Sequence, residues 1–126
     1  MNFIIVFIGG GLGSICRYGI NIIISRNFNI HFPLATLICN FISALIIGGL
    51  IGMALGQSKL SDTHRLLLVT GFCGGFSTFS AFTFETFELM RAQQNGLAIA
   101  NVVLSIAGCL FFFWIGWKAS LNLFNQ

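Results

Sequence analysis

Four long apolar stretches limit what this chain can fold into. They cover residues 3–24, 33–55, 66–89 and 97–121, and each has the roughly 20 residues that a helix needs to cross a bilayer core about 30 Å thick. The connections are short, so they leave no room for a domain outside the membrane. The pattern predicts an all-α membrane protein in which residues 1–126 form one domain of four transmembrane helices. We expect the first stretch to be a permanent span, because no basic residue precedes it as in a signal peptide.

The charge content excludes the main alternatives to a membrane protein. Only 7% of the residues are charged, whereas a soluble domain carries about 25%. The six Lys and Arg residues are scattered, so they form no patch that could bind nucleic acid. A disordered chain is excluded as well, because disorder requires low hydrophobicity.

The basic residues divide almost evenly between the two sides of the membrane. With four spans, they are Lys59, Arg65 and Lys118 on the side of the termini, and Arg26, Arg91 and, if its side chain reaches the interface, Arg17 on the other. The excess of Lys and Arg that marks the cytoplasmic side is therefore almost absent. Two alternatives stay open: one weakly determined orientation, or insertion in both orientations, which would give antiparallel dimers.

Cysteines and glycines indicate helix packing. The four cysteines fall in four different spans without CxxC spacing, so we expect packing roles and no metal or disulfide framework. Glycines recur four residues apart, a spacing that allows helix backbones to approach closely in lipid. These pairs are Gly9 and Gly13, Gly48 and Gly52, Gly52 and Gly56, and Gly71 and Gly75.

The third stretch contains a run of Gly, Ser and Thr that continues a helix poorly. Gly74 and Gly75 are followed by Ser77 and Thr78. Non-helical backbone at membrane depth requires a cover of protein or a water-filled cavity, and its free carbonyls can coordinate a cation. We predict that the third helix is broken here; a flexed but continuous helix is the alternative.

Polar side chains recur on single helical faces of two other stretches. Thr36, Asn40 and Ser43 share a face of the second, and Asn101 and Ser105 share a face of the fourth. Intramembrane polar residues often hydrogen-bond to neighbouring helices, and we expect this role of Ser43 and Asn101. Asn40 differs because its amide brings two donors into an apolar run.

Two phenylalanines of the third stretch differ from an ordinary apolar stripe. Phe79 and Phe82 lie three residues apart, and hydroxyls such as Ser80 and Thr83 alternate with them. The edge of an aromatic ring is weakly positive and can face an anion. Such a surface could replace the water around an ion with many weak donors, which predicts an anion-tolerant pore.

The segment Gly-Gly-Phe-Ser-Thr-Phe-Ser-Ala-Phe at 74–82 closely resembles the signature of the Fluc/CrcB fluoride-channel family. The glycine-rich stretch 9–17, which ends in Arg17, and the segment 36–40 resemble the family too, so the likeness covers the whole chain. Members are bacterial-type channels of the plasma membrane that relieve cytoplasmic fluoride by passive export. They assemble as antiparallel, dual-topology homodimers with two pores. The resemblance therefore implies an ion channel and no enzyme.

The resemblance also implies roles for individual residues. Together with the hydroxyls above, the predicted fluoride path consists of Thr36, Asn40, Phe79, Ser80, Phe82, Thr83 and Ser105, with Arg17 near the aqueous vestibule. The backbone carbonyls of Gly74 and Ser77, from both subunits, would hold a structural sodium ion at the dimer interface. Glu85 falls on a polar position of the family. Two positions depart from common family patterns: Ser77 replaces a frequent threonine, and Asn101 stands where many members have tyrosine. The second departure leaves undecided which polar side chains of the fourth span line the path.

Two other classes of protein compete with a channel. A small dual-topology, proton-coupled multidrug antiporter needs an intramembrane carboxylate. No acidic residue appears before Asp62, and Glu85 is the candidate. An assembly subunit without transport activity would need none of the constellation formed by Asn40, Phe79 and Phe82. Passive anion release without a proton gradient distinguishes the channel from both.

Overall fold

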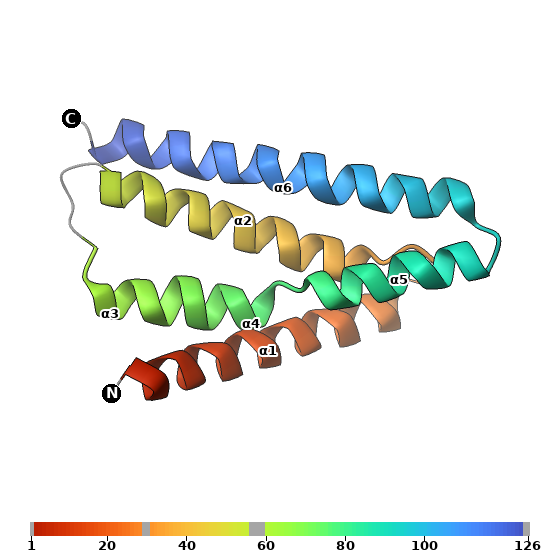
Figure 1. Cartoon of the computed structure of the whole chain (residues 1–126), viewed down its shortest axis with the longest axis horizontal. Helices are drawn as coiled ribbons and strands as arrows, with labels where there is room; N and C mark the ends of the chain where they lie inside the picture. The colour runs from red at the N-terminus through yellow and green to blue at the C-terminus, as the bar shows by residue number, and fades with distance from the viewer. Residues whose placement is uncertain (1, 29–30, 56–59, 125–126) are drawn as a thin grey trace.

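The computed structural model describes residues 2–28, 31–55 and 60–124, so Gly56 and Lys59 lie outside the described residues. Four crossings run side by side, and the two ends of the chain lie at the same end of the bundle (Figure 1). In chain order the elements are α1 (Asn2–Asn27), α2 (Leu34–Leu55), α3 (Asp62–Arg65), the π-helix η1 (Leu66–Cys73), α4 (Gly74–Phe76), α5 (Phe79–Arg91) and α6 (Asn95–Phe124).

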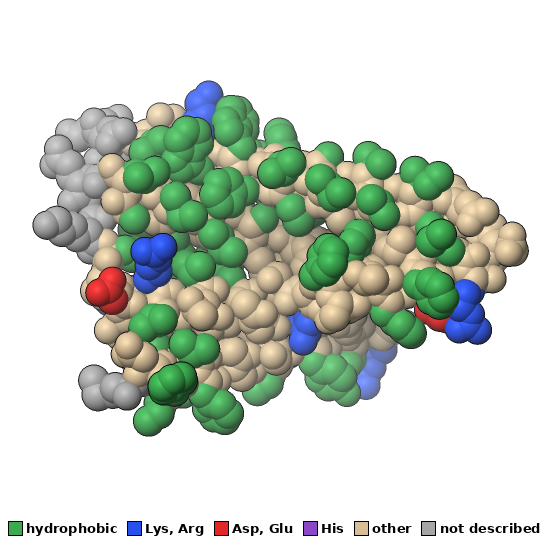
Figure 2. Space-filling model, viewed as in Figure 1, with side chains coloured by type: hydrophobic (Ala, Val, Ile, Leu, Met, Phe, Trp, Pro, Cys, Tyr) green, Lys and Arg blue, Asp and Glu red, His purple; other side chains and the backbone are tan. Residues whose placement is uncertain are grey.

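Each crossing is long and apolar enough to span a membrane, as the sequence predicts. The third is composite, because α3, η1, α4 and α5 together cover Asp62–Arg91. It begins four residues before the predicted stretch, since Ser61 caps the helix by accepting a hydrogen bond from the His64 amide. Apolar side chains are distributed along the whole length of the visible face, and charged side chains are few there (Figure 2). This surface suits lipid better than water.

Glycines bring the helix backbones into direct contact, which confirms the packing role predicted for them. A β-carbon at Gly48 of α2 would collide with the Phe113 carbonyl of α6, and one at Gly116 of α6 would collide with the Leu45 carbonyl of α2. The contact is therefore reciprocal, and it makes α2 and α6 the most extensively packed pair of helices. In lipid, van der Waals contact of this kind supplies much of the association energy.

The first half of the third crossing packs on α1 in the same way. A β-carbon at Gly13 would collide with the Phe72 carbonyl, and one at Gly75 with the backbone of Gly10. Phe76, next in the chain, is buried. The chain thus forms two glycine-packed helix pairs, α1 with η1 and α4, and α2 with α6.

The third helix is broken, as predicted, and the alternative of a continuous helix is wrong. After α4 ends, Ser77 (φ −79°, ψ 160°) and Thr78 (φ −156°, ψ 124°) are extended, and α5 then begins at Phe79. The interruption is visible between α4 and α5 (Figure 1). Thr78 caps the new helix by accepting a hydrogen bond from the Ala81 amide at 3.2 Å. The eight-residue π-helix before the break was not predicted.

A three-residue turn joins α5 to α6. Gln93 adopts φ 59°, in the left-handed region, and its amide donates to the Met90 carbonyl at 3.0 Å. The Gln94 amide donates to the Leu89 carbonyl at 2.9 Å. These two bonds form a Schellman motif with glutamine at the position that glycine usually occupies.

Candidate functional site

The break is held by the side-chain amide of Asn40. Its Oδ1 accepts a hydrogen bond from the Thr78 amide at 2.8 Å, and its Nδ2 donates to the Thr78 carbonyl at 3.3 Å. Asn40 thus pairs with both backbone groups of a residue that has left the helix, which would otherwise be costly in an apolar environment. Two of the four hydrogen-bonding positions of the amide are used, and one N–H of Nδ2 and one lone pair of Oδ1 remain.

Ser77 and α1 satisfy other polar groups near the break. The amide and the hydroxyl of Ser77 both donate to the Cys73 carbonyl, at 2.9 and 2.7 Å. The Ser14 hydroxyl of α1 donates to the Gly75 carbonyl at 3.4 Å. Among the described residues, no hydrogen bond reaches the carbonyls of Gly74 and Ser77. Two backbone oxygens therefore remain available where the helix is interrupted.

The two predicted pore phenylalanines pack against each other at the start of α5. Their ring centroids are 5.5 Å apart with an angle of 42° between the planes. Phe79 is 78% exposed, whereas Phe82 is half-buried. The exposed Thr83 donates its hydroxyl to the Phe79 carbonyl at 2.9 Å, and the exposed Ser80 shares a hydrogen bond with the Thr78 hydroxyl at 3.2 Å. The Phe79 ring therefore projects from the break with hydroxyls around it.

A cavity of about 290 Å³ connects α2, the break and α6. Its polar and aromatic walls come from Asn40, Ser43, Ser77, Thr78, Phe79 and Cys109. Of the predicted fluoride path, this cavity brings together Asn40 and Phe79, while Thr36, Ser105 and Arg17 lie outside its walls. The sequence indicated only a packing role for Cys109; its place in this wall depends on the rotation of α6 against α2.

Thr36 and Glu85 form a second polar link between α2 and α5. The buried Thr36 hydroxyl donates to Glu85 Oε1 at 2.6 Å. The other carboxylate oxygen of Glu85 is buried without a hydrogen-bond partner among the described residues. Glu85 also lines a cavity of about 410 Å³ together with His31 and Glu88. Glu85 therefore both hydrogen-bonds to α2 and faces a cavity.

A third polar link joins α6 to α5. Asn101 is only 2% exposed, and its Nδ2 donates to the Thr86 hydroxyl at 2.9 Å. That hydroxyl in turn donates to the Phe82 carbonyl at 2.7 Å. The prediction that Asn101 hydrogen-bonds to a neighbouring helix is confirmed. Thr86 was not predicted, although its position four residues after Phe82 was an available signal.

The structure places three further residues that the sequence singled out, and it tests the predicted role of one of them, Ser43. Ser105 is buried on α6 and Arg17 is half-buried on α1, and among the described residues Arg17 forms no ion pair. The prediction that Ser43 hydrogen-bonds to a neighbouring helix is wrong: its hydroxyl is buried without a partner in the described part of the chain. The reason is geometric: Ser43 borders the cavity, and no acceptor of the break or of α6 lies within hydrogen-bond distance of its hydroxyl.

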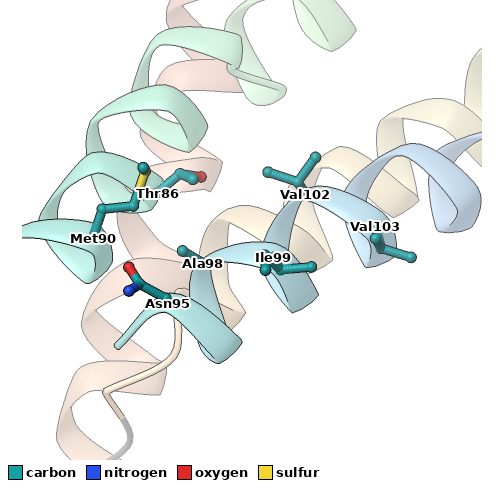
Figure 3. Close-up of a pocket in the computed structure, with 7 residues that line it drawn as sticks. All are labelled: Thr86, Met90, Asn95, Ala98, Ile99, Val102 and Val103. Atoms are coloured by element: carbon teal, nitrogen blue, oxygen red, sulfur yellow. The ribbon is translucent and has the colours of Figure 1, made fainter. Parts of the chain in front are cut away.

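A separate cavity of about 330 Å³ lies between the ends of α5 and α6, away from the break. Thr86 and Met90 of α5 lie on one side of it, and residues of α6 such as Ala98 and Ile99 lie on the other (Figure 3). Its walls are almost entirely apolar and contain no charged group. It therefore lacks the donors that a site for a small ion requires.

Comparison with known proteins identifies the family. A family model described as "CrcB-like protein, Camphor Resistance (CrcB)" matches residues 4–117. A protein of Clostridium perfringens named fluoride-specific ion channel FluC is 38% identical over 121 residues, which cover 96% of this chain and 94% of that protein. A Pyrococcus abyssi protein of the same name is 40% identical over 114 residues, which cover 90% and 91% of the two chains. The resemblance found in the sequence is thus confirmed, and the chain belongs to the CrcB-like family.

Proposed function

We propose that this protein is a fluoride-specific channel of the cell membrane, through which fluoride leaves the cytoplasm passively. The observation that carries the proposal is the cavity at the break, where Asn40 is fixed by Thr78 beside the exposed ring of Phe79. Family membership and the names of the relatives support the choice of ion. The absence of Lys and Arg from the walls of this cavity is consistent with conduction rather than trapping.

The mechanism follows from the hydration of the ion. Fluoride binds water strongly, so a selective path must replace that water with several donors at once. Asn40 offers an amide N–H, the hydroxyls near the break offer O–H groups, and the edges of Phe79 and Phe82 offer weakly positive C–H groups. Each contact is individually weak, so the ion can enter a site and also leave it.

We propose the other members of the path on two grounds. Thr36 and Ser105 match polar positions of the family, and Ser80 and Thr83 alternate with the two phenylalanines, so these four would extend the polar lining. Arg17 also matches a family position and would attract the anion at the vestibule. The half-buried position of Arg17, with no carboxylate paired to it among the described residues, supports the latter role.

The functional unit would be an antiparallel homodimer with two pores. Phe79 is 78% exposed although it lies midway along a crossing, and the cavity beside it is open in a single chain. A second copy of the chain would cover both. The nearly even distribution of Lys and Arg supports insertion in both orientations.

A structural sodium ion would brace the two breaks at the centre of that dimer. The carbonyls of Gly74 and Ser77 fit such an ion, because they accept no hydrogen bond among the described residues and oxygen is the donor that hard cations prefer. Since the contribution is a backbone oxygen, serine in place of the more frequent threonine at Ser77 is compatible with it. The ion would supply a fixed positive charge between the two pores.

Passive efflux from liposomes tests the function. Vesicles that contain the purified protein are loaded with potassium fluoride or potassium chloride, and valinomycin balances the charge without a proton gradient. We expect rapid release of fluoride and none of chloride. Fluoride release that requires an imposed proton gradient would contradict the channel and would favour an antiporter.

A further inference from the structure

Ser43 lies in the cavity wall, and its hydroxyl has no function in the path described above. It lies on α2 one turn after Asn40, and its side chain is almost fully buried, with 2% exposure. The hydroxyl has no hydrogen-bond partner among the described residues. In a transmembrane helix, a serine hydroxyl normally donates to the carbonyl four residues earlier, which here belongs to Cys39, but no such bond forms.

A buried donor without an acceptor destabilises a protein, unless something that is bound there accepts the hydrogen bond. Ser43 borders the cavity of about 290 Å³, which has room for a small ion. The hydroxyl oxygen of Ser43 is itself buried, so a rotation about χ1 would turn it toward an ion in the cavity. The same face of α2 presents the unused N–H of Asn40, so two donors lie one turn apart on one wall. The opposite wall is formed by Ser77, Thr78 and Phe79 of the break.

The donors on this wall specify the chemistry of the occupant. The cavity walls contain no carboxylate and no basic group, so a tightly held multivalent ion of either sign is not suited to them. Two neutral donors facing an aromatic residue suit a small monovalent anion that has lost part of its water.

We propose that Ser43 donates a hydrogen bond to the transported anion, and that Ser43 and Asn40 together form a binding site for partly dehydrated fluoride. This inference rests on the proposed function and adds a residue and a site to it. Asn40 is held in place by Thr78, so Ser43 supplies the donor that is free to follow the ion.

The test compares Ser43→Ala with Ser120→Ala in the liposome assay with potassium fluoride. Ser120 is a matched control, because it is also buried in a transmembrane helix, at 7% exposure, but lies outside the cavity wall. Loss of a charge-assisted hydrogen bond should slow fluoride efflux about tenfold in Ser43→Ala. Efflux through Ser120→Ala should equal that of the unchanged protein.

Thermal unfolding of the same purified proteins, in sodium fluoride and in sodium chloride, gives a second measurement. We expect the shift in Tm produced by fluoride to be smaller in Ser43→Ala than in the unchanged protein. Unchanged efflux and an unchanged shift would overturn the role of Ser43 and leave the channel function intact. A loss of Tm that is equal in both salts, with normal efflux, would identify the occupant as water and also overturn the inference. If the unchanged protein releases no fluoride, the proposed function fails, and the inference fails with it.

Discussion

The two halves of the third crossing are held in the membrane by different forces. The first half, residues 66–76, buries Gly71, Cys73 and Phe76 and meets the backbone of α1 directly. In the second half, α5, only Leu89 is buried. Hydrogen bonds from α2 and α6 hold this half instead, through the pairs Thr36–Glu85 and Asn101–Thr86. Close packing thus anchors the first half, whereas a few polar contacts position the second half and leave one side of it open.

The largest effect is expected from substitutions that disrupt the packing of the first half of the third crossing on α1. In Gly13→Ala the new methyl group would collide with the Phe72 carbonyl, and in Gly75→Ala with the backbone of Gly10, where no side chain can move aside. We expect either variant to lose most of its folded, monodisperse protein in size-exclusion chromatography. Gly11→Ala is the control, because nothing lies within 4 Å of the added β-carbon. Normal yields of all three variants would show that α1 and η1 do not need this contact.

The next largest effect should come from substitutions in the fluoride path, which should reduce efflux while the protein still folds. In Asn40→Asp the Nδ2 donor to Thr78 is lost and a negative charge enters the membrane, at a cost of about 3 kcal/mol. Fluoride efflux should therefore fall by about 100-fold or more. In Phe82→Ile the ring edge is removed without a change in polarity, and efflux should also be abolished. Both variants should elute at the volume of the unchanged protein; efflux at the normal rate would contradict the assigned path.

Removal of sodium tests whether a bound ion stabilises the break, where the two halves of the third crossing meet. If the carbonyls of Gly74 and Ser77 hold sodium, replacing it with N-methyl-D-glucamine removes a bound ligand. The free energy of unfolding should then fall by about 1–3 kcal/mol, and Tm should fall with it. Efflux should fall in parallel, and restoring sodium should reverse both effects. Equal Tm values in the two cations would contradict a sodium site. Potassium serves as a control for ionic strength.

The smallest effect concerns the polar contacts of α5. Asn101→Ala and Thr86→Val each remove one partner of the hydrogen bond between α6 and α5. A double-mutant cycle on the free energy of unfolding should give a coupling of about 0.6 kcal/mol, typical of such bonds in membranes. Efflux should change only slightly, because Asn101 acts on the pore through Thr86 and the backbone of Phe82. A coupling near zero would mean that α5 is positioned by other contacts.

The predictable parts of this molecule were those that depend on local sequence. Apolar length specified the four crossings, and the run from Gly74 to Thr78 specified the break, because glycine and hydroxyl residues weaken a helix wherever it packs. The spacing of small residues likewise predicted that helix backbones approach closely, as Gly13 and Gly48 illustrate.

The parts that were missed depend on how the helices are rotated against one another. The alignment of Asn40 with both backbone groups of Thr78 requires a particular rotation of α2, which no pattern within α2 encodes. The hydroxyl of Ser43, which was expected to bond to a neighbouring helix, has no partner among the described residues, and no pattern within α2 indicates this. The π-helix was not predicted either, and it lies along the close contact with α1.

The short turn at Gln93 has a consequence for the biogenesis of the protein. The third crossing is less apolar than the second or the fourth, and its second half contains Thr83, Glu85 and Thr86. Three residues reach only about 10 Å, so the turn keeps the ends of α5 and α6 close together during insertion. We expect the two helices to be inserted together as a hairpin, in which the strongly apolar α6 favours the entry of a less apolar partner.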